Sequence, residues 1–254
     1  AATASERDGV IVFPSFLTDN EQHELIESVE NTLASSLNHH DDDFTSETRE
    51  ASYRVHKSLP VQPAAINDLC VRLWPILSQI LQADKMPLLG CGFMQVHPGA
   101  KGQELHKDVH HYDRHDGVMG VLGRGGSRTV SIQLQLTDTH TASTSSNSSS
   151  LGSLEVLPGS HRPDAAAGHP DQIRRALEEN AGVVPVCVPG GTATMYSSRL
   201  WHRGGANDDS EVSRTFCFLT VTEPDAPAPP GLIHTMKMED VGKWLLSSKG
   251  IEKA

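Results

Sequence analysis

The pattern of hydrophobic and polar positions divides the chain into a helical first third and a β-rich remainder. A short apolar run at residues 10–13 is followed by Thr18 and Glu21, which have the spacing of a capping box and predict the start of a helix. Apolar residues then recur at three- and four-residue spacing, and they do so again between residues 66 and 80. Two amphipathic helices are therefore expected before the β-rich part begins.

Short segments with β-type alternation, separated by glycine and proline, begin at Leu88. In the clearest of them, residues 130–136, apolar and polar residues alternate strictly, so one face should pack on a core and the other should present polar side chains. A short helix is expected at residues 171–180 and a last helix near Val241. Helices followed by many short strands predict a mainly β fold with flanking helices, a sandwich or a barrel. The polar residues of the alternating strand are Ser131, Gln133 and Gln135.

Two stretches, residues 38–52 and residues 141–150, are strongly polar, and the second consists almost entirely of serine and threonine. We interpret both as exposed loops, because such compositions bury too little apolar surface to form part of a core. His110, His111 and His115 crowd residues 109–127, which we expect to form much of the mouth of the fold. We expect most of these histidines to be exposed loop residues.

The composition limits the class of protein. A length of 254 residues fits one domain, and the net charge of −11 argues against a nucleic-acid partner, which requires clustered cations. The longest apolar runs are shorter than the ~20 residues that span a bilayer. The four cysteines form no C-x-x-C pair, and the chain begins at Ala1 without methionine. We therefore expect an intracellular protein, cytoplasmic or organellar after removal of a targeting segment, whose oligomeric state the sequence leaves open.

His106 and Asp108 carry the clearest chemical signal, because residues two apart on an extended strand point to the same face. A second imidazole must come from elsewhere in the fold, and His202, within Trp-His-Arg-Gly-Gly, offers it. Arg214 follows on a neighbouring segment. Two histidines and one carboxylate on one face of an octahedron leave three positions open, which is the arrangement of non-haem iron(II) oxygenases.

These motifs occur in an order that resembles the phytanoyl-CoA dioxygenase-like family of iron(II)/2-oxoglutarate-dependent oxygenases. The resemblance covers most of the chain, from Gly-Val-Ile-Val-Phe-Pro-Ser-Phe-Leu-Thr at residues 9–18 to Arg214. Between them lie His106-x-Asp108, Leu-Glu-Val-Leu-Pro-Gly-Ser-His at residues 154–161 and Trp-His-Arg-Gly-Gly-Ala-Asn at residues 201–207. A His-x-Asp pair alone is a weak signal, whereas these elements in this order are together a strong one.

The resemblance implies a double-stranded β-helix core, of the jelly-roll or cupin-like type, in one domain spanning residues 1–254. Helical support would occupy about residues 15–85, the core about residues 88–222, and a C-terminal extension residues 223–254. His106, Asp108 and His202 would ligate Fe(II). Arg214 would bind the distal carboxylate of 2-oxoglutarate, and Gln95 would contact the same co-substrate.

The implied activity is hydroxylation or desaturation of a small-molecule substrate with 2-oxoglutarate and dioxygen, releasing succinate and carbon dioxide. Asp108 favours these outcomes, because related halogenases have a small residue at this position that leaves room for chloride. The residues do not identify the substrate. Two other interpretations stay open: a cupin-like divalent-metal isomerase or hydrolase that uses no 2-oxoglutarate, and a non-catalytic jelly-roll binding module.

Overall fold

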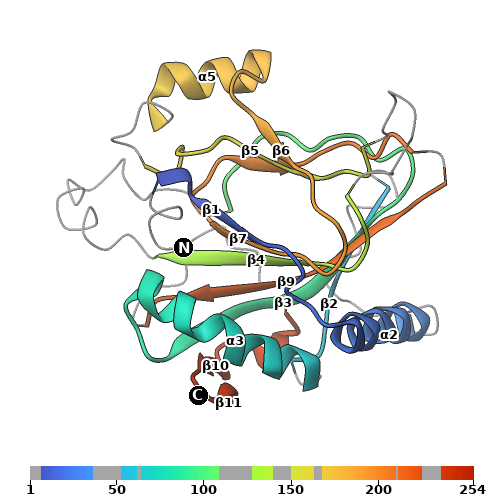
Figure 1. Cartoon of the computed structure of the whole chain (residues 1–254), viewed down its shortest axis with the longest axis vertical. Coiled ribbons are helices and arrows are strands. Elements are labelled where there is room, and N and C mark those ends of the chain that lie inside the picture. Colours follow the sequence, from blue (N-terminus) through green and yellow to red (C-terminus); the bar gives the residue numbers. More distant parts are fainter. Residues whose placement is uncertain are drawn as a thin grey trace.

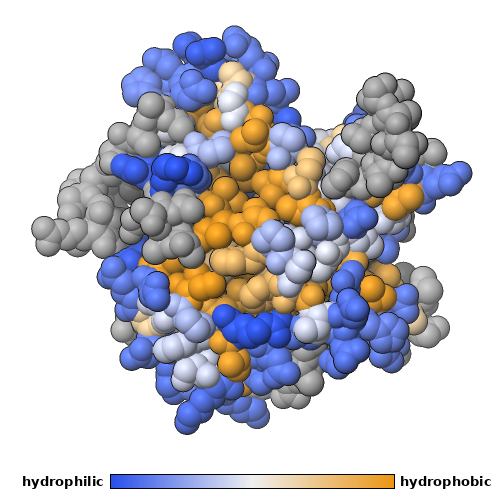
Figure 2. Space-filling model, viewed as in Figure 1, coloured by the Kyte–Doolittle hydropathy of each residue, from blue (hydrophilic) through white to orange (hydrophobic). Residues whose placement is uncertain are grey.

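The computed structural model describes residues 7–36, 53–61, 64–108, 128–139, 150–162, 168–209, 211–224 and 236–254. The expected loop at residues 38–52, the segment 109–127 with His110, His111 and His115, and residues 141–149 lie outside them. The described part is mainly β, as predicted, with helices at the periphery (Figure 1). In the same view, hydrophobic residues gather in the centre and hydrophilic residues surround them (Figure 2). In chain order the elements are β1 (Val10–Phe13), α2 (Asp19–Ser36), β2 (Arg54–Ser58), α3 (Ala64–Leu81), β3 (Met86–Val96), β4 (Thr129–Gln135), β5 (Leu154–Val156), α5 (Pro170–Glu179), β6 (Val184–Val186), β7 (Ala193–Ser197), β8 (His202–Gly204), β9 (Arg214–Thr222), the 3-10 turn η2 (Met238–Asp240), β10 (Trp244–Ser247) and β11 (Gly250–Lys253).

Two antiparallel sheets face each other in the centre of the molecule (Figure 1). The eight-stranded sheet has the order β1-β7-β4-β9-β3-β10-β11, with β2 also paired to β3, and the three-stranded sheet has the order β6-β5-β8. Strands that neighbour each other are often distant in sequence, as where β4 lies between β7 and β9. This is the predicted jelly-roll arrangement, in which the inner faces of two opposed sheets are available for a site.

The main hydrophobic core lies between the large sheet and helices α2 and α3, which cover its outer face (Figure 1). Helix α3 contributes the fully buried side chains of Leu69, Leu73 and Leu77, which follow helical spacing, and β4 contributes Ile132 and Leu134. Burial of one such side chain contributes about 1.5–3 kcal/mol to folding. This layer therefore holds in place the sheet on which the site is built.

Helix α2 begins where the capping box predicts. The amide of Glu21 donates to Thr18 Oγ1 at 3.3 Å, and the Glu21 carboxylate accepts from the amide of Thr18 at 2.8 Å. The same carboxylate forms an ion pair with Arg72 of α3, with 2.6 Å between Oε1 and Nη1. The hydrogen bonds from Arg72 lower the pKa of Glu21 despite the opposing effect of burial, and the pair ties the two helices together.

The alternation in β4 is confirmed, but the polar face of the strand is buried as well. Its four polar residues, Thr129, Ser131, Gln133 and Gln135, are at most 7% exposed, and they are on the face that looks into the space between the two sheets. The register places Ser131 opposite Tyr196 and Gln133 opposite Thr194 of β7. Since buried polar groups require partners, this row of side chains is where a functional site is expected.

The C-terminal segment joins the large sheet. In place of the helix expected near Val241, a single 3-10 turn leads into a hairpin of β10 and β11. Strand β10 pairs with the start of β3, where Leu246 stands opposite Met86 and both side chains are fully buried. This segment forms a strand because it can pair with the start of β3, and residue spacing within the segment does not reveal that partner.

Candidate metal centre

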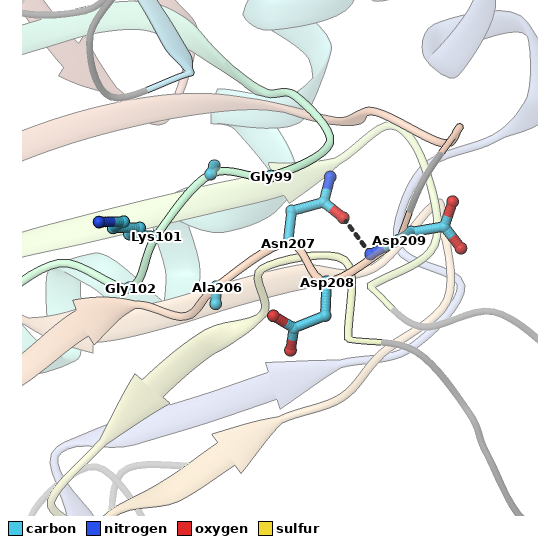
Figure 3. Close-up of a pocket in the computed structure, with 8 residues that line it drawn as sticks. Gly99, Lys101, Gly102, Ala206, Asn207, Asp208 and Asp209 are labelled. Atoms are coloured by element: carbon cyan, nitrogen blue, oxygen red, sulfur yellow. Dashed lines mark hydrogen bonds between the residues drawn. The ribbon is translucent and has the colours of Figure 1, made fainter.

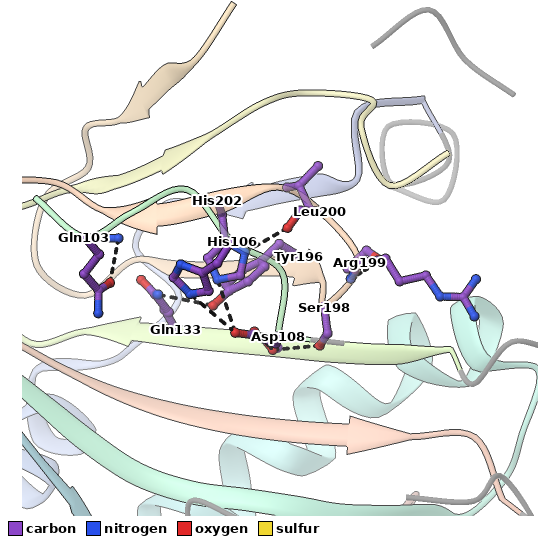
Figure 4. A network of polar contacts seen from close by, with 12 residues as sticks. Gln103, His106, Asp108, Gln133, Tyr196, Ser198, Arg199, Leu200 and His202 are labelled. Carbon is purple, nitrogen blue, oxygen red and sulfur yellow. Dashed lines mark hydrogen bonds and ion pairs between the residues drawn. The ribbon is translucent and has the colours of Figure 1, made fainter. Parts of the chain in front are cut away.

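The backbone brings His106 and His202 together. They form an isolated antiparallel bridge in which the amide of each residue donates to the carbonyl of the other, with 2.9 Å between N and O in both directions. Residues directly opposite in an antiparallel pair have their side chains on the same face. The two imidazoles therefore lie side by side, with their ring centroids 4.6 Å apart (Figure 4).

Each imidazole is oriented by the carbonyl group two residues before it. His106 Nδ1 lies 2.7 Å from the carbonyl oxygen of Glu104, and His202 Nδ1 lies 2.8 Å from that of Leu200. A carbonyl oxygen only accepts, so both Nδ1 atoms carry a proton and donate. The lone pair is then on Nε2 of each neutral ring, which is the arrangement seen in metal-ligating histidines.

Asp108 completes the cluster on the same side. Its Oδ1 lies 3.4 Å from His202 Nε2 and 3.9 Å from His106 Nε2. One ligand atom from each of the three residues lies within 4.8 Å of the others. Atoms that share an ion at about 2.1 Å are separated by distances of this order, so the three side chains could hold a metal ion. These are the residues that the sequence predicted.

In the absence of an ion, protonated His202 and ionised Asp108 stabilise each other. Burial lowers the pKa of His202, but Asp108 raises it more, so the pKa lies above its ordinary value. Burial raises the pKa of Asp108, but the two imidazoles and Ser131 lower it more, so it lies below its ordinary value. A cation that binds at this point replaces the proton of the buried imidazole.

Two glycines after the distal histidine allow its strand to approach its neighbours closely. A Cβ on Gly204 would lie 2.8 Å from Gln103 Oε1, and one on Gly205 would lie 2.9 Å from Glu155 Oε1. Because glycine has no Cβ, the backbone amide of Gln103 can donate to the carbonyl of Gly204, and the backbone amide of Gly204 can donate to Gln103 Oε1, both at 2.9 Å. The glycines of Trp-His-Arg-Gly-Gly thus maintain the ladder that contains the bridge between the histidines.

The Leu-Pro-Gly-Ser-His element supports the same strand. Ser160 Oγ accepts a hydrogen bond from the amide of Trp201 at 3.0 Å, and the amide of Leu157 donates to the carbonyl of Trp201 at 2.9 Å. Gly159 has a φ of +80°, a conformation that favours glycine and forms the turn between them. The element therefore fixes the residue that directly precedes His202.

Arg214 is a buried cation on the inner face of β9. It is 1% exposed, and it donates from Nε to Gln135 Oε1 at 3.2 Å, from Nη2 to Gln133 Oε1 at 3.4 Å and from Nη1 to the carbonyl of Gly152. No carboxylate of the described residues forms an ion pair with it. Burial, and then the nearby Arg54 cation, lower its pKa. A buried guanidinium that lacks a carboxylate partner in the described residues favours binding of an anion.

Two buried hydroxyl groups lie beside the amides that contact Arg214. Thr192 and Thr194 are at most 1% exposed, and within the described part of the chain their Oγ1 atoms have no hydrogen-bond partner. Thr194 stands opposite Gln133, and the carbonyl of Thr192 accepts the amide of Gln135 at 2.9 Å. Two unused hydroxyl donors near an unpaired guanidinium form surroundings suited to a carboxylate.

Gln95 is the candidate residue that the structure does not bring to this site. In the register of β3 and β9 it stands opposite Thr215, and its Nε2 donates to Thr215 Oγ1 at 3.3 Å. Val96 is the residue opposite Arg214, and successive residues of a strand point to opposite faces. Gln95 is therefore directed to the other face of the large sheet.

Sequence reasoning missed several side chains that surround the cluster. The ring centroid of Tyr196 lies 4.9 Å from that of His202, and the Tyr196 hydroxyl accepts from Gln133 Nε2 at 3.4 Å (Figure 4). Burial, and then the charge of Asp108, raise the pKa of Tyr196, which keeps its phenol neutral. The signal that could have found this layer is the polar row of β4, whose residues were predicted to share a face.

A pocket lies between residues 99–102 and residues 206–209, next to the ladder that contains the bridge between the histidines (Figure 3). This pocket of about 320 Å³ has Lys101 and Asp209 in its lining and none of the three candidate metal ligands. The Oδ1 atom of Asp209 accepts two backbone amides of the turn that follows it, both at 2.8 Å. Asp209 therefore has a structural role in forming that turn.

Residues 5–216 match the family model described as phytanoyl-CoA dioxygenase (PhyH). This range covers most of the chain and contains the three ligand candidates as well as Arg214. The chain belongs to the phytanoyl-CoA dioxygenase family. Membership makes the protein an enzyme of the iron- and 2-oxoglutarate-dependent class, and the cluster of two histidines and an aspartate supplies a site that could hold its metal. Among curated proteins, no match was found.

Several solved structures have a similar fold, and they include an α-ketoglutarate-dependent epimerase. AviO1 from Streptomyces viridochromogenes Tue57 is 20% identical, with a TM-score of 0.58 over 91% of this chain and 96% of AviO1. The α-ketoglutarate-dependent epimerase SnoN, solved with Fe³⁺, α-ketoglutarate and nogalamycin RO, is 17% identical, with a TM-score of 0.62 over 91% of this chain and 86% of SnoN. EctD from S. alaskensis, solved with bound Fe, is 21% identical, with a TM-score of 0.58 over 92% of this chain and 82% of EctD. These similarities confirm the fold of the phytanoyl-CoA dioxygenase family member described here.

Proposed function

We propose that the protein is a dioxygenase that hydroxylates or desaturates a small-molecule substrate, with Fe(II) held by His106, Asp108 and His202 and 2-oxoglutarate bound at Arg214. The observation that carries this proposal is the pairing of two features inside one barrel. A cluster with the ligand atoms of a facial triad, held mainly by β8 of the three-stranded sheet, shares the space between the sheets with a buried guanidinium on β9 of the large sheet. Gln133 connects them, because it accepts from Arg214 and donates to Tyr196, whose ring packs on His202. The guanidinium has no carboxylate partner in the described residues.

The donor set fits iron. Two imidazoles whose Nδ1–H groups are held by carbonyls, so that the lone pair of the neutral ring is on Nε2, and one carboxylate form the 2-His-1-carboxylate set of non-haem Fe(II) oxygenases, which leaves coordination positions open. A structural zinc site usually has four protein ligands, and three are present among the described residues. This composition favours a catalytic ion over a structural one.

The polar pocket fits a dicarboxylate. Arg214 offers a planar fork that matches a carboxylate, and the hydroxyls of Thr192 and Thr194 offer donors that have no partner among the described residues. An anion that binds here compensates the charge of Arg214, so binding relieves a cost that the ligand-free protein carries. An isomerase, a hydrolase or a binding module that uses no 2-oxoglutarate would not require this buried cation.

The chain's own residues then have separate tasks. When bound, iron and 2-oxoglutarate supply the oxidising chemistry that activates dioxygen and removes a substrate hydrogen, with release of succinate and carbon dioxide. Arg214 and the threonine hydroxyls orient the co-substrate, while the carbonyls of Glu104 and Leu200 hold the imidazoles in the ligating tautomer. The neutral phenol of Tyr196 packs against His202 and limits its rotation.

The substrate class and the compartment belong to the proposal as well. Neighbouring structures were solved with the small molecules nogalamycin RO and hygromycin B, which supports a small-molecule substrate here. None of the helices in the described ranges combines the length and apolar character needed to cross a membrane. All four cysteines are free, and Cys70, Cys91 and Cys217 are buried, which supports the intracellular setting.

The proposal is tested by spectroscopy and by product analysis. Addition of Fe(II) and 2-oxoglutarate to the protein without oxygen should give a weak visible charge-transfer band, which comes from chelation of an open Fe(II) site. Under air, and with ascorbate to supply the two electrons that a substrate would otherwise provide, the same mixture should form succinate, and the His202→Ala variant should show neither signal. Absence of both signals from the unmodified protein would rule out the proposed function.

A further inference from the structure

We propose that Ser131 is a positioning residue that keeps Asp108 a one-oxygen ligand and so reserves coordination positions for 2-oxoglutarate and dioxygen. The inference rests on the proposed function and extends it to a residue that does not belong to the metal-binding motif. Ser131 lies on the inner face of β4, where it is 5% exposed.

The two carboxylate oxygens of Asp108 have different surroundings. Oδ1 faces the two imidazoles, at 3.4 Å from His202 Nε2 and 3.9 Å from His106 Nε2. Oδ2 is turned to β4, where Ser131 Oγ lies 3.2 Å away (Figure 4 shows Asp108 between the histidines and this strand). One oxygen is therefore available to a shared ion, and the other is engaged by the protein.

The direction of the hydrogen bonds is fixed by chemistry. An ionised carboxylate accepts and does not donate, so the hydroxyl of Ser131 donates its proton to Asp108. Ser131 Oγ also lies 2.9 Å from the hydroxyl of Ser198, which is fully buried. Since Ser131 has already used its single proton, Ser198 donates to Ser131. The result is a chain from Ser198 through Ser131 to Oδ2 of Asp108, in which each donor polarises the next.

This chain of hydrogen bonds affects how many coordination positions stay open on the metal. A carboxylate can bind a metal through one oxygen or through both, and two-oxygen binding would occupy a fourth position beside the two imidazoles. Chelation by 2-oxoglutarate uses two positions and dioxygen requires one more, so all three positions left by one-oxygen binding are needed. The bond from Ser131 to Oδ2 opposes the rotation that would bring this oxygen to the metal.

The test compares metal binding with co-substrate binding in the whole protein. Mn(II) affinity is measured from the free-ion electron paramagnetic resonance signal, and 2-oxoglutarate affinity from the charge-transfer band of the anaerobic Fe(II) protein. In Ser131→Ala we expect the Mn(II) Kd to change by less than about threefold, because the freed oxygen remains a metal ligand. We expect the 2-oxoglutarate Kd to rise by about tenfold or more, which corresponds to about 1.4 kcal/mol, because the second carboxylate oxygen then competes for a coordination position.

Two further variants separate positioning from folding. Ser131→Thr keeps the hydroxyl and should restore most of the 2-oxoglutarate affinity. Ser58→Ala is the control, because it removes a buried hydroxyl of the same size from β2, which contributes no residue to the cluster, and it should change the 2-oxoglutarate Kd by less than about threefold. Thermal melting checks that each variant is folded. Parallel loss of Mn(II) and 2-oxoglutarate affinity in Ser131→Ala and Ser58→Ala would overturn the inference, and so would a Ser131→Ala variant identical to the unmodified protein. If the unmodified protein gives no band, the proposed function itself fails.

Discussion

Replacement of Arg214 by methionine isolates the contribution of the buried cation. Methionine is long, flexible and apolar, so it fills most of the space without a charge. In the present structure the guanidinium is 1% exposed, donates to two glutamine side chains and one backbone carbonyl, and has no carboxylate partner in the described ranges. If this cation receives the distal carboxylate of 2-oxoglutarate, the variant leaves that carboxylate buried and unpaired.

The expected loss is large. Removing one partner of a buried ion pair costs about 3–5 kcal/mol. With 1.4 kcal/mol for each factor of ten, the 2-oxoglutarate Kd of Arg214→Met should rise about 140-fold to 3,700-fold. The unfolding free energy of the ligand-free variant should change much less, because relief from burying an unpaired cation offsets the hydrogen bonds that Gln133 and Gln135 lose.

Isothermal titration of the Mn(II)-loaded protein with 2-oxoglutarate measures this loss. Arg203→Met is the matched control, because Arg203 is on β8 next to His202 but pairs with Glu155 at 2.6 Å. Its 2-oxoglutarate Kd should stay within about threefold of the unmodified protein. An Arg214→Met variant that binds 2-oxoglutarate within tenfold of the unmodified protein would refute the assignment of this residue.

Three other predictions follow from the structure. Thr194→Val removes a buried hydroxyl that has no hydrogen-bond partner in the described ranges, so the ligand-free protein should be as stable or more stable, while the 2-oxoglutarate Kd rises about fivefold to tenfold. Calorimetry that shows unchanged 2-oxoglutarate affinity would remove Thr194 from the pocket. Asp108 raises the pKa of His202 above 6.5 despite its burial, and a proton on His202 competes with the metal. As the pH is lowered from 8, Mn(II) affinity should therefore start to fall before pH 6.5 is reached. An affinity that stays constant from pH 8 to below 6.5 contradicts this. Glu21→Gln keeps the capping box but loses the charge that pairs with Arg72, so the unfolding free energy at pH 7 should drop by about 0.5–1 kcal/mol. The pKa of Glu21 is lower in the folded than in the unfolded protein, so this stabilisation is present above the unfolded pKa of about 4.5 and is lost as the pH falls through the folded pKa. Denaturant titrations in which Glu21→Gln has the same loss of unfolding free energy at pH 7 and at pH 3 would disprove it.

Local patterns in the sequence predicted those features whose causes are local. The capping box at Thr18 and Glu21 depends on residues three apart, and the hydrogen bonds confirm it. The alternation in β4 depends on the two-residue period of a strand, and it correctly separated the apolar from the polar face. The two-residue spacing of His106 and Asp108 likewise placed both side chains in one cluster.

Features that depend on register between distant strands could not be obtained in this way. Whether the polar face of β4 meets water or a second sheet is decided by the strands that pack against it, and the strand alone is equally compatible with both. Gln95 illustrates the same difficulty, because its face of the sheet follows from pairing with Thr215 of β9. The segment near Val241 becomes part of a sheet because β3 offers an edge far away in the sequence.

A crystal structure of the protein soaked without oxygen in Mn(II), as a surrogate for Fe(II), and 2-oxoglutarate tests the central claim most directly. The account predicts one ion at about 2.0–2.2 Å from Nε2 of His106, Nε2 of His202 and one carboxylate oxygen of Asp108, with the distal carboxylate of 2-oxoglutarate on the guanidinium of Arg214. An ion bound elsewhere, or a co-substrate that leaves Arg214 without a carboxylate, would contradict it.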